Sequence, residues 1–150
     1  MKKWALILFC IIFFSACNEH KVYDKFRETP MSGWEKNDTL KYDVPRVKVG
    51  GSYHIGLSMR IGNNFPFKSI TLIVEQTIFP SHKKNTKSVK CNVIDNNGRA
   101  TGRGIGIYQY DFDVTTLNLH ANDSLHICIR HNMKREIIPG VSNVGINVSR

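Results

Sequence analysis

Three glycines near position 104 have the spacing best suited to ligand chemistry in this chain. Gly102, Gly104 and Gly106 alternate with other residues, and the backbone amides of such a loop can cradle a phosphate group. That chemistry needs a helix after the loop, because the amides at a helix N-terminus complete the anion site. Residues 105–114 instead alternate apolar and polar side chains, which predicts a strand. We therefore interpret the glycines as a bend or bulge and predict no nucleotide cofactor.

Acidic and nucleophilic side chains form no recognisable catalytic or metal-binding set. Asp95 opens an Asx-rich stretch that lacks the closing glutamate of a calcium loop, so a turn is the preferred interpretation. Asp111 and Asp113 share one face of a predicted strand and could reach a cation. The sequence has no Gly-x-Ser-x-Gly motif and neither the Cys-x-x-Cys nor the His-x3-His spacing of metal sites. We predict that the protein is not an enzyme and has no catalytic residues, cofactor or metal.

Cys17 offers the clearest covalent chemistry. A short basic start precedes an unbroken apolar run over residues 4–14 and the small pair Ser15-Ala16, a pattern typical of a bacterial secretory signal. Cysteine directly after the small pair resembles a lipobox, which implies that Cys17 becomes the first mature residue and binds the membrane through acyl chains. The alternatives are a transmembrane anchor or a signal cut by an ordinary peptidase. A membrane-spanning helix needs about 20 apolar residues, and this run is shorter.

Length and charge indicate one exported, basic domain. Removing residues 1–16 leaves 134 of the 150 residues, enough for a hydrophobic core. Loss of Lys2 and Lys3 lowers the formal net charge from +9 to about +7. A basic exported protein could favour anionic lipid headgroups, lipopolysaccharide or an acidic partner, although its basic residues are scattered along the sequence. We do not expect nucleic acid as a partner of a lipid-tethered exported chain.

Cys91 and Cys128 would remain as an even pair after lipidation of Cys17, and an exported protein could oxidise them to a disulfide. The strand pattern argues against this bond. Cys128 shares a strand face with the polar His126, whereas Cys91 is in phase with the apolar Val89. Because an inward and an outward sulfur cannot meet at disulfide distance, we favour two free thiols and keep the disulfide as the alternative.

Period-two alternation of apolar and polar side chains dominates the chain beyond Trp34, and no stretch shows a helical period. About seven or eight such runs are separated by glycine- and asparagine-rich turns. We predict an all-β protein, an antiparallel β-sandwich of jelly-roll or immunoglobulin-like type. Its expected organisation is a removed signal peptide over residues 1–16, a lipidated cysteine and tether over 17–33, and one sandwich domain over 34–150.

The predicted core follows from the apolar phase of these runs. Side chains on that phase should face the partner sheet, because successive side chains of a strand point to opposite faces. The positions expected to be buried are Tyr53, Ile55, Leu57, Met59, Leu72, Val74, Ile127, Ile129, Val144 and Ile146.

The segment Phe65-Pro66-Phe67 is the main candidate for a partner-binding surface. It follows Asn63-Asn64 in a predicted turn, where apolar side chains have no automatic reason to be buried. Proline pre-sets the backbone, and two aromatic rings on a rigid loop could form a hot spot for a protein partner. The alternative is that both rings fold back and plug the end of the sandwich.

The ordered motifs of the chain resemble those of the gliding-motility lipoprotein H (GldH) family of Bacteroidota. The resemblance covers nearly the whole chain beyond the signal, and its C-terminal motif is the closest match. The matching segments are Tyr23-Asp24-Lys25, Gly33-Trp34-x-Lys36-x-Asp38, Arg60-x-x-Asn63-Asn64-Phe65-Pro66-Phe67, Asp95-x-x-Gly98, Gly102-x-Gly104-x-Gly106 and Ile138-Pro139-Gly140-Val141-x-Asn143-Val144-Gly145-Ile146.

The resemblance implies an outer-membrane lipoprotein of the gliding-motility and type IX secretion machinery, without enzymatic activity, that acts by protein-protein interaction with envelope or secretion proteins. Residues 18–21 lack a clear acidic surface-export signal after the cysteine, which slightly favours the periplasmic face of the outer membrane. The alternative function is a glycan- or ligand-binding surface lipoprotein. An extended groove lined by exposed aromatic rings would favour that alternative, and an exposed apolar patch would favour protein-protein interaction.

Overall fold

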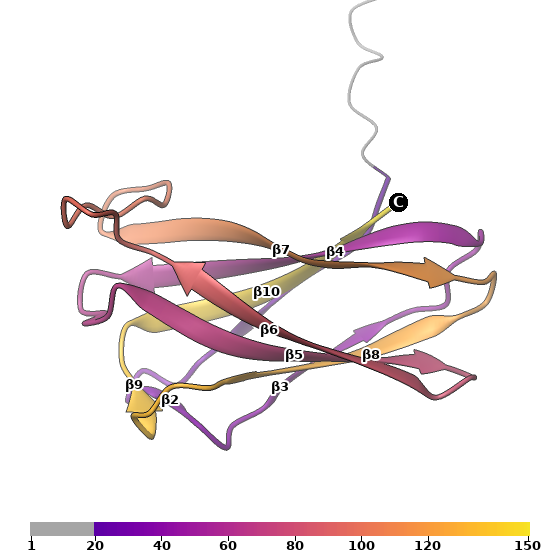
Figure 1. Ribbon diagram of the computed structural model, residues 1–150, viewed down its shortest axis with the longest axis horizontal. Coiled ribbons are helices and arrows are strands. Elements are labelled where there is room, and N and C mark those ends of the chain that lie inside the picture. Colours follow the sequence, from indigo (N-terminus) through magenta and orange to yellow (C-terminus); the bar gives the residue numbers. More distant parts are fainter. Residues whose placement is uncertain (1–19) are drawn as a thin grey trace, which may run out of the picture.

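The computed structural model describes residues 20–150, and this part of the chain folds as a β-sandwich without helices (Figure 1). Sheet I has the strand order β1-β10-β4-β7, sheet II has the order β3-β8-β5-β6, and β2 pairs with β9 in a small third sheet. All strand pairs are antiparallel, which confirms the predicted fold class. The strands are β1 (Lys21–Glu28), β2 (Trp34–Glu35), β3 (Leu40–Val44), β4 (Gly51–Gly62), β5 (Ser69–Phe79), β6 (Lys83–Asn92), β7 (Ile107–Leu119), β8 (Ser124–His131), β9 (Ile137–Ile138) and β10 (Val141–Ser149).

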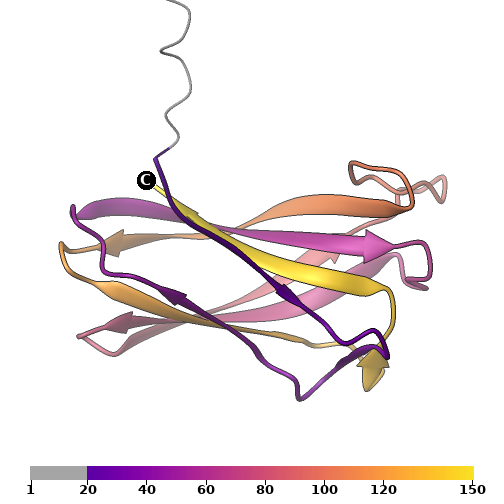
Figure 2. The same cartoon turned by 180° about the vertical axis from the view of Figure 1, so that it is seen from behind.

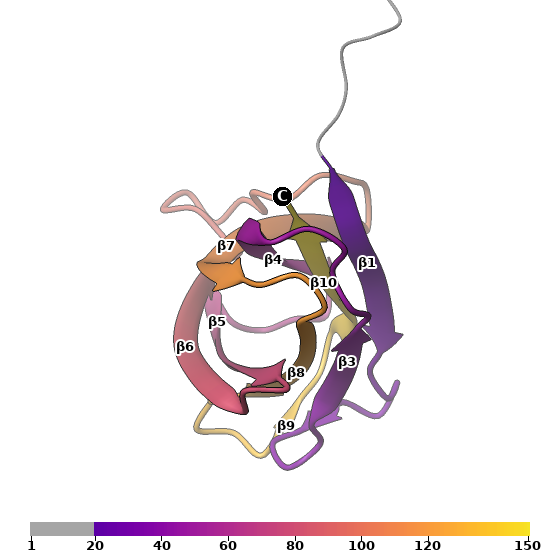
Figure 3. The same cartoon turned by 90° about the vertical axis from the view of Figure 1, so that its right-hand side faces the viewer.

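The core lies between sheets I and II, which curve around it when the sandwich is viewed from its end (Figure 3). All ten side chains predicted to be buried are at most 2% exposed, so the period-two pattern identified the inward faces correctly. One buried hydrogen bond also joins the sheets: the Tyr42 hydroxyl of β3 donates to the Val144 carbonyl of β10 at 2.6 Å.

Residues 21–28 differ from the expected tether, because they form β1 at the edge of sheet I. This strand pairs with β10 from Lys21–Ser149 to Glu28–Asn143, so the N- and C-terminal strands lie side by side (Figure 2). Most side chains of β1 are exposed, and only Tyr23 and Phe26 are half-buried. Backbone hydrogen bonding to β10 therefore holds this edge strand. Because most of its side chains are exposed, the sequence of β1 shows no alternation of apolar and polar residues.

A bulge in β7 changes which side chains face the core. The pairing of β7 with β4 shifts by one residue next to Val114. Tyr110 and Leu117 are both buried, although they are seven positions apart and strict alternation would place them on opposite faces. The bulge thus lets one long strand contribute to the core on both sides of the shift.

The free edge of sheet II carries lysines. β6 begins at Lys83, and its exposed side chains include Lys84, Lys87 and Lys90. Lysines on an edge strand disfavour pairing with a strand of another molecule, because the charges would have to be desolvated. This edge is therefore a poor docking place for an added strand.

Candidate functional site

The segment that follows β1 and the loop that precedes β7 lie at the same end of the sandwich (Figure 2), and they carry three exposed apolar side chains. We use the name apolar tip for Met31, Ile105 and Ile107, which are 105%, 100% and 55% exposed. Met31 and Ile107 line the same hollow of about 680 Å³, together with backbone of the β4–β5 and β9–β10 turns. Exposed apolar side chains at one end of a domain favour an interaction surface there.

The tip is held by the loop over residues 93–106, which the glycine motif shapes. Arg103 pairs with Gln109 as a β-bridge, so the chain doubles back before β7 begins. Gly104 has φ +130°, and a Cβ there would lie 2.3 Å from the Ile107 carbonyl oxygen. Only glycine fits this bend, and β7 rather than a helix follows it. The glycines therefore serve backbone geometry, as predicted.

Phe65-Pro66-Phe67 lies in the β4–β5 turn but does not present two rings to solvent. Phe65 is 7% exposed and belongs to the core, Phe67 is half-buried against it, and Pro66 is exposed. The two rings meet edge to face with their centroids 5.5 Å apart. This arrangement agrees with the alternative in which the rings close the end of the sandwich, and it leaves Pro66 as the exposed member of the segment.

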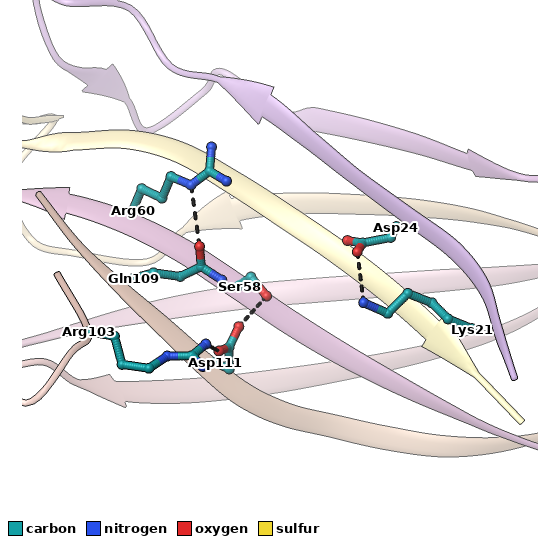
Figure 4. Close-up of polar contacts among 7 residues, drawn as sticks. All are labelled: Lys21, Asp24, Ser58, Arg60, Arg103, Gln109 and Asp111. Carbon is teal, nitrogen blue, oxygen red and sulfur yellow. Dashed lines mark hydrogen bonds and ion pairs between the residues drawn. The ribbon is translucent and has the colours of Figure 1, made fainter. Parts of the chain in front are cut away.

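The outer face of sheet I carries a second candidate surface, a polar groove of about 480 Å³ (Figure 4). Gly56 lines this groove and has no side chain to fill it. A Cβ at this position would lie only 2.4 Å from the Asn147 side chain. Asp111 accepts hydrogen bonds from the Ser58 hydroxyl at 2.6 Å and from the Arg103 guanidinium at 2.5 Å. At the far side of the groove, Lys21 pairs with Asp24 at 2.9 Å.

The aromatic surface next to this groove is covered. The Arg60 guanidinium lies 4.2 Å above the centre of the Phe26 ring, and its Nε donates to the Gln109 amide oxygen at 3.4 Å. A sugar ring would have to displace this cation before stacking on Phe26. Phe26 and Phe112 are the aromatic residues that line the groove, and this cation covers the Phe26 ring.

Asp111 and Asp113, which could reach a cation by sequence, are both occupied by protein cations or polar groups. Asp111 binds Arg103 and Ser58, and Asp113 lies 3.0 Å from the His54 ring nitrogen. Among residues 20–150, no group of three or more histidine, cysteine, aspartate or glutamate side chains is placed to hold a metal ion. The two carboxylates instead organise the polar face of sheet I.

The cysteines of the described residues are free. Cys91 of β6 is fully buried, and burial raises the pKa of its thiol to about 12. Cys128 of β8 lies on the outer face of sheet II, so the two sulfurs face different ways, as the strand pattern predicted. Cys17 lies outside the described residues.

Cys128 belongs to a chain of contacts that the sequence spacing did not suggest. Its sulfur lies 3.3 Å from His126 Nε2, and His126 Nδ1 lies 2.6 Å from an Asp43 carboxylate oxygen on the neighbouring strand. These contacts have the order of nucleophile, base and orienting acid. Burial nevertheless raises the pKa of the Cys128 thiol, which disfavours the reactive thiolate.

His131 is a buried polar side chain whose role the sequence did not reveal. Its Nε2 lies 3.1 Å from the Trp34 carbonyl oxygen, and the Met133 amide donates to its Nδ1 at 3.4 Å. The neutral ring with hydrogen on Nε2 satisfies both contacts. Burial lowers the pKa of His131. Its imidazole also packs edge to face on the Trp34 ring, with the ring centroids 5.3 Å apart. His131 therefore connects β8 to the small β2–β9 sheet.

The lowered pKa of His131 predicts a pH dependence of stability. The unfolded chain takes up the histidine proton near pH 6.5, whereas the folded protein does so only at lower pH, so stability falls as pH falls below about 6.5. We expect His131→Gln to be less stable at pH 7 but to lose less stability between pH 7 and pH 5. Urea unfolding at both pH values measures this, with the exposed His20→Gln as control. Equal losses in wild type and His131→Gln would contradict the assignment.

Comparison with known families decides where the chain belongs. Residues 21–148 match the family model described as GldH lipoprotein. The chain belongs to the GldH lipoprotein family. This confirms the resemblance inferred from the motifs. No helix within residues 20–150 is long and apolar enough to cross a bilayer.

Two curated relatives give the family its context. The gliding motility lipoprotein GldH of Flavobacterium johnsoniae is 24% identical over 104 residues, which cover 69% of this chain and 64% of the relative. The gliding motility lipoprotein GldH homolog of Christiangramia forsetii is 25% identical over 101 residues, which cover 67% of this chain and 60% of the relative. The chain thus spans less than two thirds of the length of either relative.

Solved structures give only distant likenesses. The mosquito-larvicidal Cry4Aa toxin of Bacillus thuringiensis matches with a TM-score of 0.49 and 8% identity, over 85% of this chain and 21% of the toxin. A cellulose-specific carbohydrate-binding module of family 28 matches with a TM-score of 0.47 and 9% identity, over 85% of this chain and 73% of the module. Both TM-scores are below 0.5, so neither likeness carries an argument about ligand or function.

Two motifs of the GldH resemblance meet in space. The Gly140 carbonyl accepts a hydrogen bond from the Gly62 amide at 2.7 Å, which joins the β9–β10 turn to the start of the β4–β5 turn. Gly140 has φ +86°, and a Cβ there would lie 2.5 Å from the Phe65 backbone nitrogen. The turn that contains Phe65 therefore packs directly on this glycine, beside the apolar tip.

Proposed function

We propose that this GldH-family lipoprotein is a non-enzymatic accessory component of a gliding-motility or type IX secretion assembly and acts by binding other envelope proteins. The observation that carries the proposal is the apolar tip, because three exposed apolar side chains on one end of a soluble domain favour a protein partner. The two relatives, both gliding motility lipoproteins, support the link to gliding motility. The partner surface is thus the tip, with Pro66 of the adjoining turn at its margin.

We further propose that acyl chains on Cys17 hold the protein in the outer membrane, on its periplasmic face. The lipobox pattern and the absence of a clear acidic export signal in residues 18–21 support this placement. β1 leads away from the anchor for eight residues, about 26 Å at the rise of a strand. The apolar tip, beyond the far end of β1, would then point away from the membrane, where partners can reach it.

A crosslinked pull-down from native membranes tests the proposal. We expect Ile105→Ser combined with Ile107→Ser to remove the envelope partner that wild type retains, because both side chains are exposed and stability should change by less than about 1 kcal/mol. Lys84→Ser combined with Lys90→Ser, on the exposed edge strand β6, is the matched control and should retain the partner. Loss of the partner in both double variants, or in neither, would count against the tip.

The glycan- or ligand-binding alternative would have to use the polar groove on sheet I. The Arg60–Phe26 contact opposes it, since the aromatic ring is already covered by a cation. Titration of oligosaccharides separates the two functions. We expect no saturable binding. Saturable binding that Asp111→Asn abolishes would favour the alternative over the protein-binding role.

A further inference from the structure

The surface around the point where the N-terminal segment enters the sandwich has its own chemistry. We use the name basal patch for Val22, Pro45, Arg46, Lys48, Val49 and Arg150, which together with His20 line a hollow of about 360 Å³. The patch is formed by the start of β1, the β3–β4 loop and the last residue of the chain. It lies at the start of β1, whereas Met31 of the apolar tip follows the end of this strand.

The length of chain outside the structure places a bilayer next to this patch. His20 is three positions after Cys17, and three fully extended residue steps span at most about 11 Å. If the acyl chains of Cys17 are in a membrane, His20 cannot lie farther than this from the lipid headgroup region. Whatever surface surrounds His20 therefore faces the bilayer, and that surface is the basal patch.

Charge and apolar exposure in the patch match a lipid surface. Arg46, Lys48 and Arg150 are exposed, and none of the three is ion-paired with a carboxylate of residues 20–150. Val22 and Val49 stand among them at 43% and 48% exposure. Basic side chains attract anionic headgroups, and apolar side chains between them can enter the boundary with the acyl chains.

We propose that the basal patch docks on anionic phospholipid headgroups of the membrane that holds the anchor. This inference rests on the lipidation of Cys17 in the proposed function and adds a second, electrostatic contact to it. One contact by lipid alone leaves a domain free to tumble, whereas a second contact fixes its orientation. Each basic side chain near an anionic surface favours the docked orientation by about fivefold. The docked domain holds β1 and the apolar tip pointing away from the bilayer.

Quenching by brominated lipids tests the proposal on the full lipidated protein. The reporter is Val49→Trp, reconstituted in vesicles of phosphatidylethanolamine alone or with phosphatidylglycerol, brominated near the acyl carbonyls. Trp34 is fully buried and provides a constant background. We expect clear quenching of the position-49 signal with phosphatidylglycerol and little without it. In the reporter background, Arg46→Glu with Lys48→Glu should lower the ratio of docked to undocked protein by more than about tenfold. A concentration of about 1 M salt should do the same.

The matched control reverses the same number of charges elsewhere. Lys134→Glu with Arg135→Glu, both exposed in the loop before β9, should leave quenching unchanged. Vesicle flotation is measured on every sample. If the protein floats with the vesicles but the tryptophan at position 49 is not quenched, the docking proposal is wrong and the anchor is retained. The same conclusion follows if quenching does not depend on phosphatidylglycerol or on the Arg46 and Lys48 changes. Wild-type protein that does not float overturns the anchor, and docking falls with it.

Discussion

Replacing Phe65 and Phe67 together by alanine is expected to lower the free energy of unfolding by about 3–5 kcal/mol, because one buried ring is removed and its half-buried partner no longer covers the gap. For a domain of this size the melting temperature should fall by about 10–20 °C. Thermal or urea unfolding followed by circular dichroism measures the change. Ile107→Ala, at the same end of the sandwich but 55% exposed, is the control and should cost less than about 1 kcal/mol.

The result also separates the two roles considered for this segment. If the rings close the sandwich, the double variant is destabilised, and any loss of partner follows from unfolding. If the segment is instead a partner site, the double variant melts like wild type and fails to co-purify the envelope partner. A double variant that is both stable and fully able to bind would exclude the two roles together.

Replacing Cys17 by serine is expected to abolish lipidation, because the acyl chains are attached through the cysteine sulfur. The anchor is then lost completely, since several acyl chains hold a protein firmly whereas weak contacts bind only reversibly. Mass spectrometry of the N-terminus measures the outcome. Wild type should begin at Cys17 with added acyl mass, and Cys128→Ser, a cysteine change outside the signal, should be lipidated like wild type. An unmodified N-terminus at any other residue in wild type would refute the anchor.

The sandwich was predictable because burial leaves a period of two in the sequence. Leu57, Ile127 and Ile146 each sit in such a run and are fully buried. The edge strand β1 was missed because backbone pairing with β10, rather than side-chain burial, holds it. His131 was missed because a lone histidine at the end of a strand looks the same whether it is exposed or bonded to Trp34 across the fold.

The candidate surfaces were harder to predict than the core. The apolar tip joins Met31 to Ile105 and Ile107, and the polar groove joins Ser58 to Arg103 and Asp111, so each depends on which loops and strands meet in space. Single apolar residues in loops leave no periodic signal. For Phe65 the sequence left exposure and burial open, and in the structure its ring packs into the core beside Gly140.

The central claim, that the apolar tip binds an envelope protein, is tested most directly by a photoreactive amino acid placed at position 107 in living cells. A second strain carries it at position 90, on the lysine-rich edge strand β6. We expect a discrete crosslinked envelope protein from position 107 and none from position 90. If an anchored, folded protein gives no adduct from position 107, or the same adducts from both positions, the tip is not the partner surface.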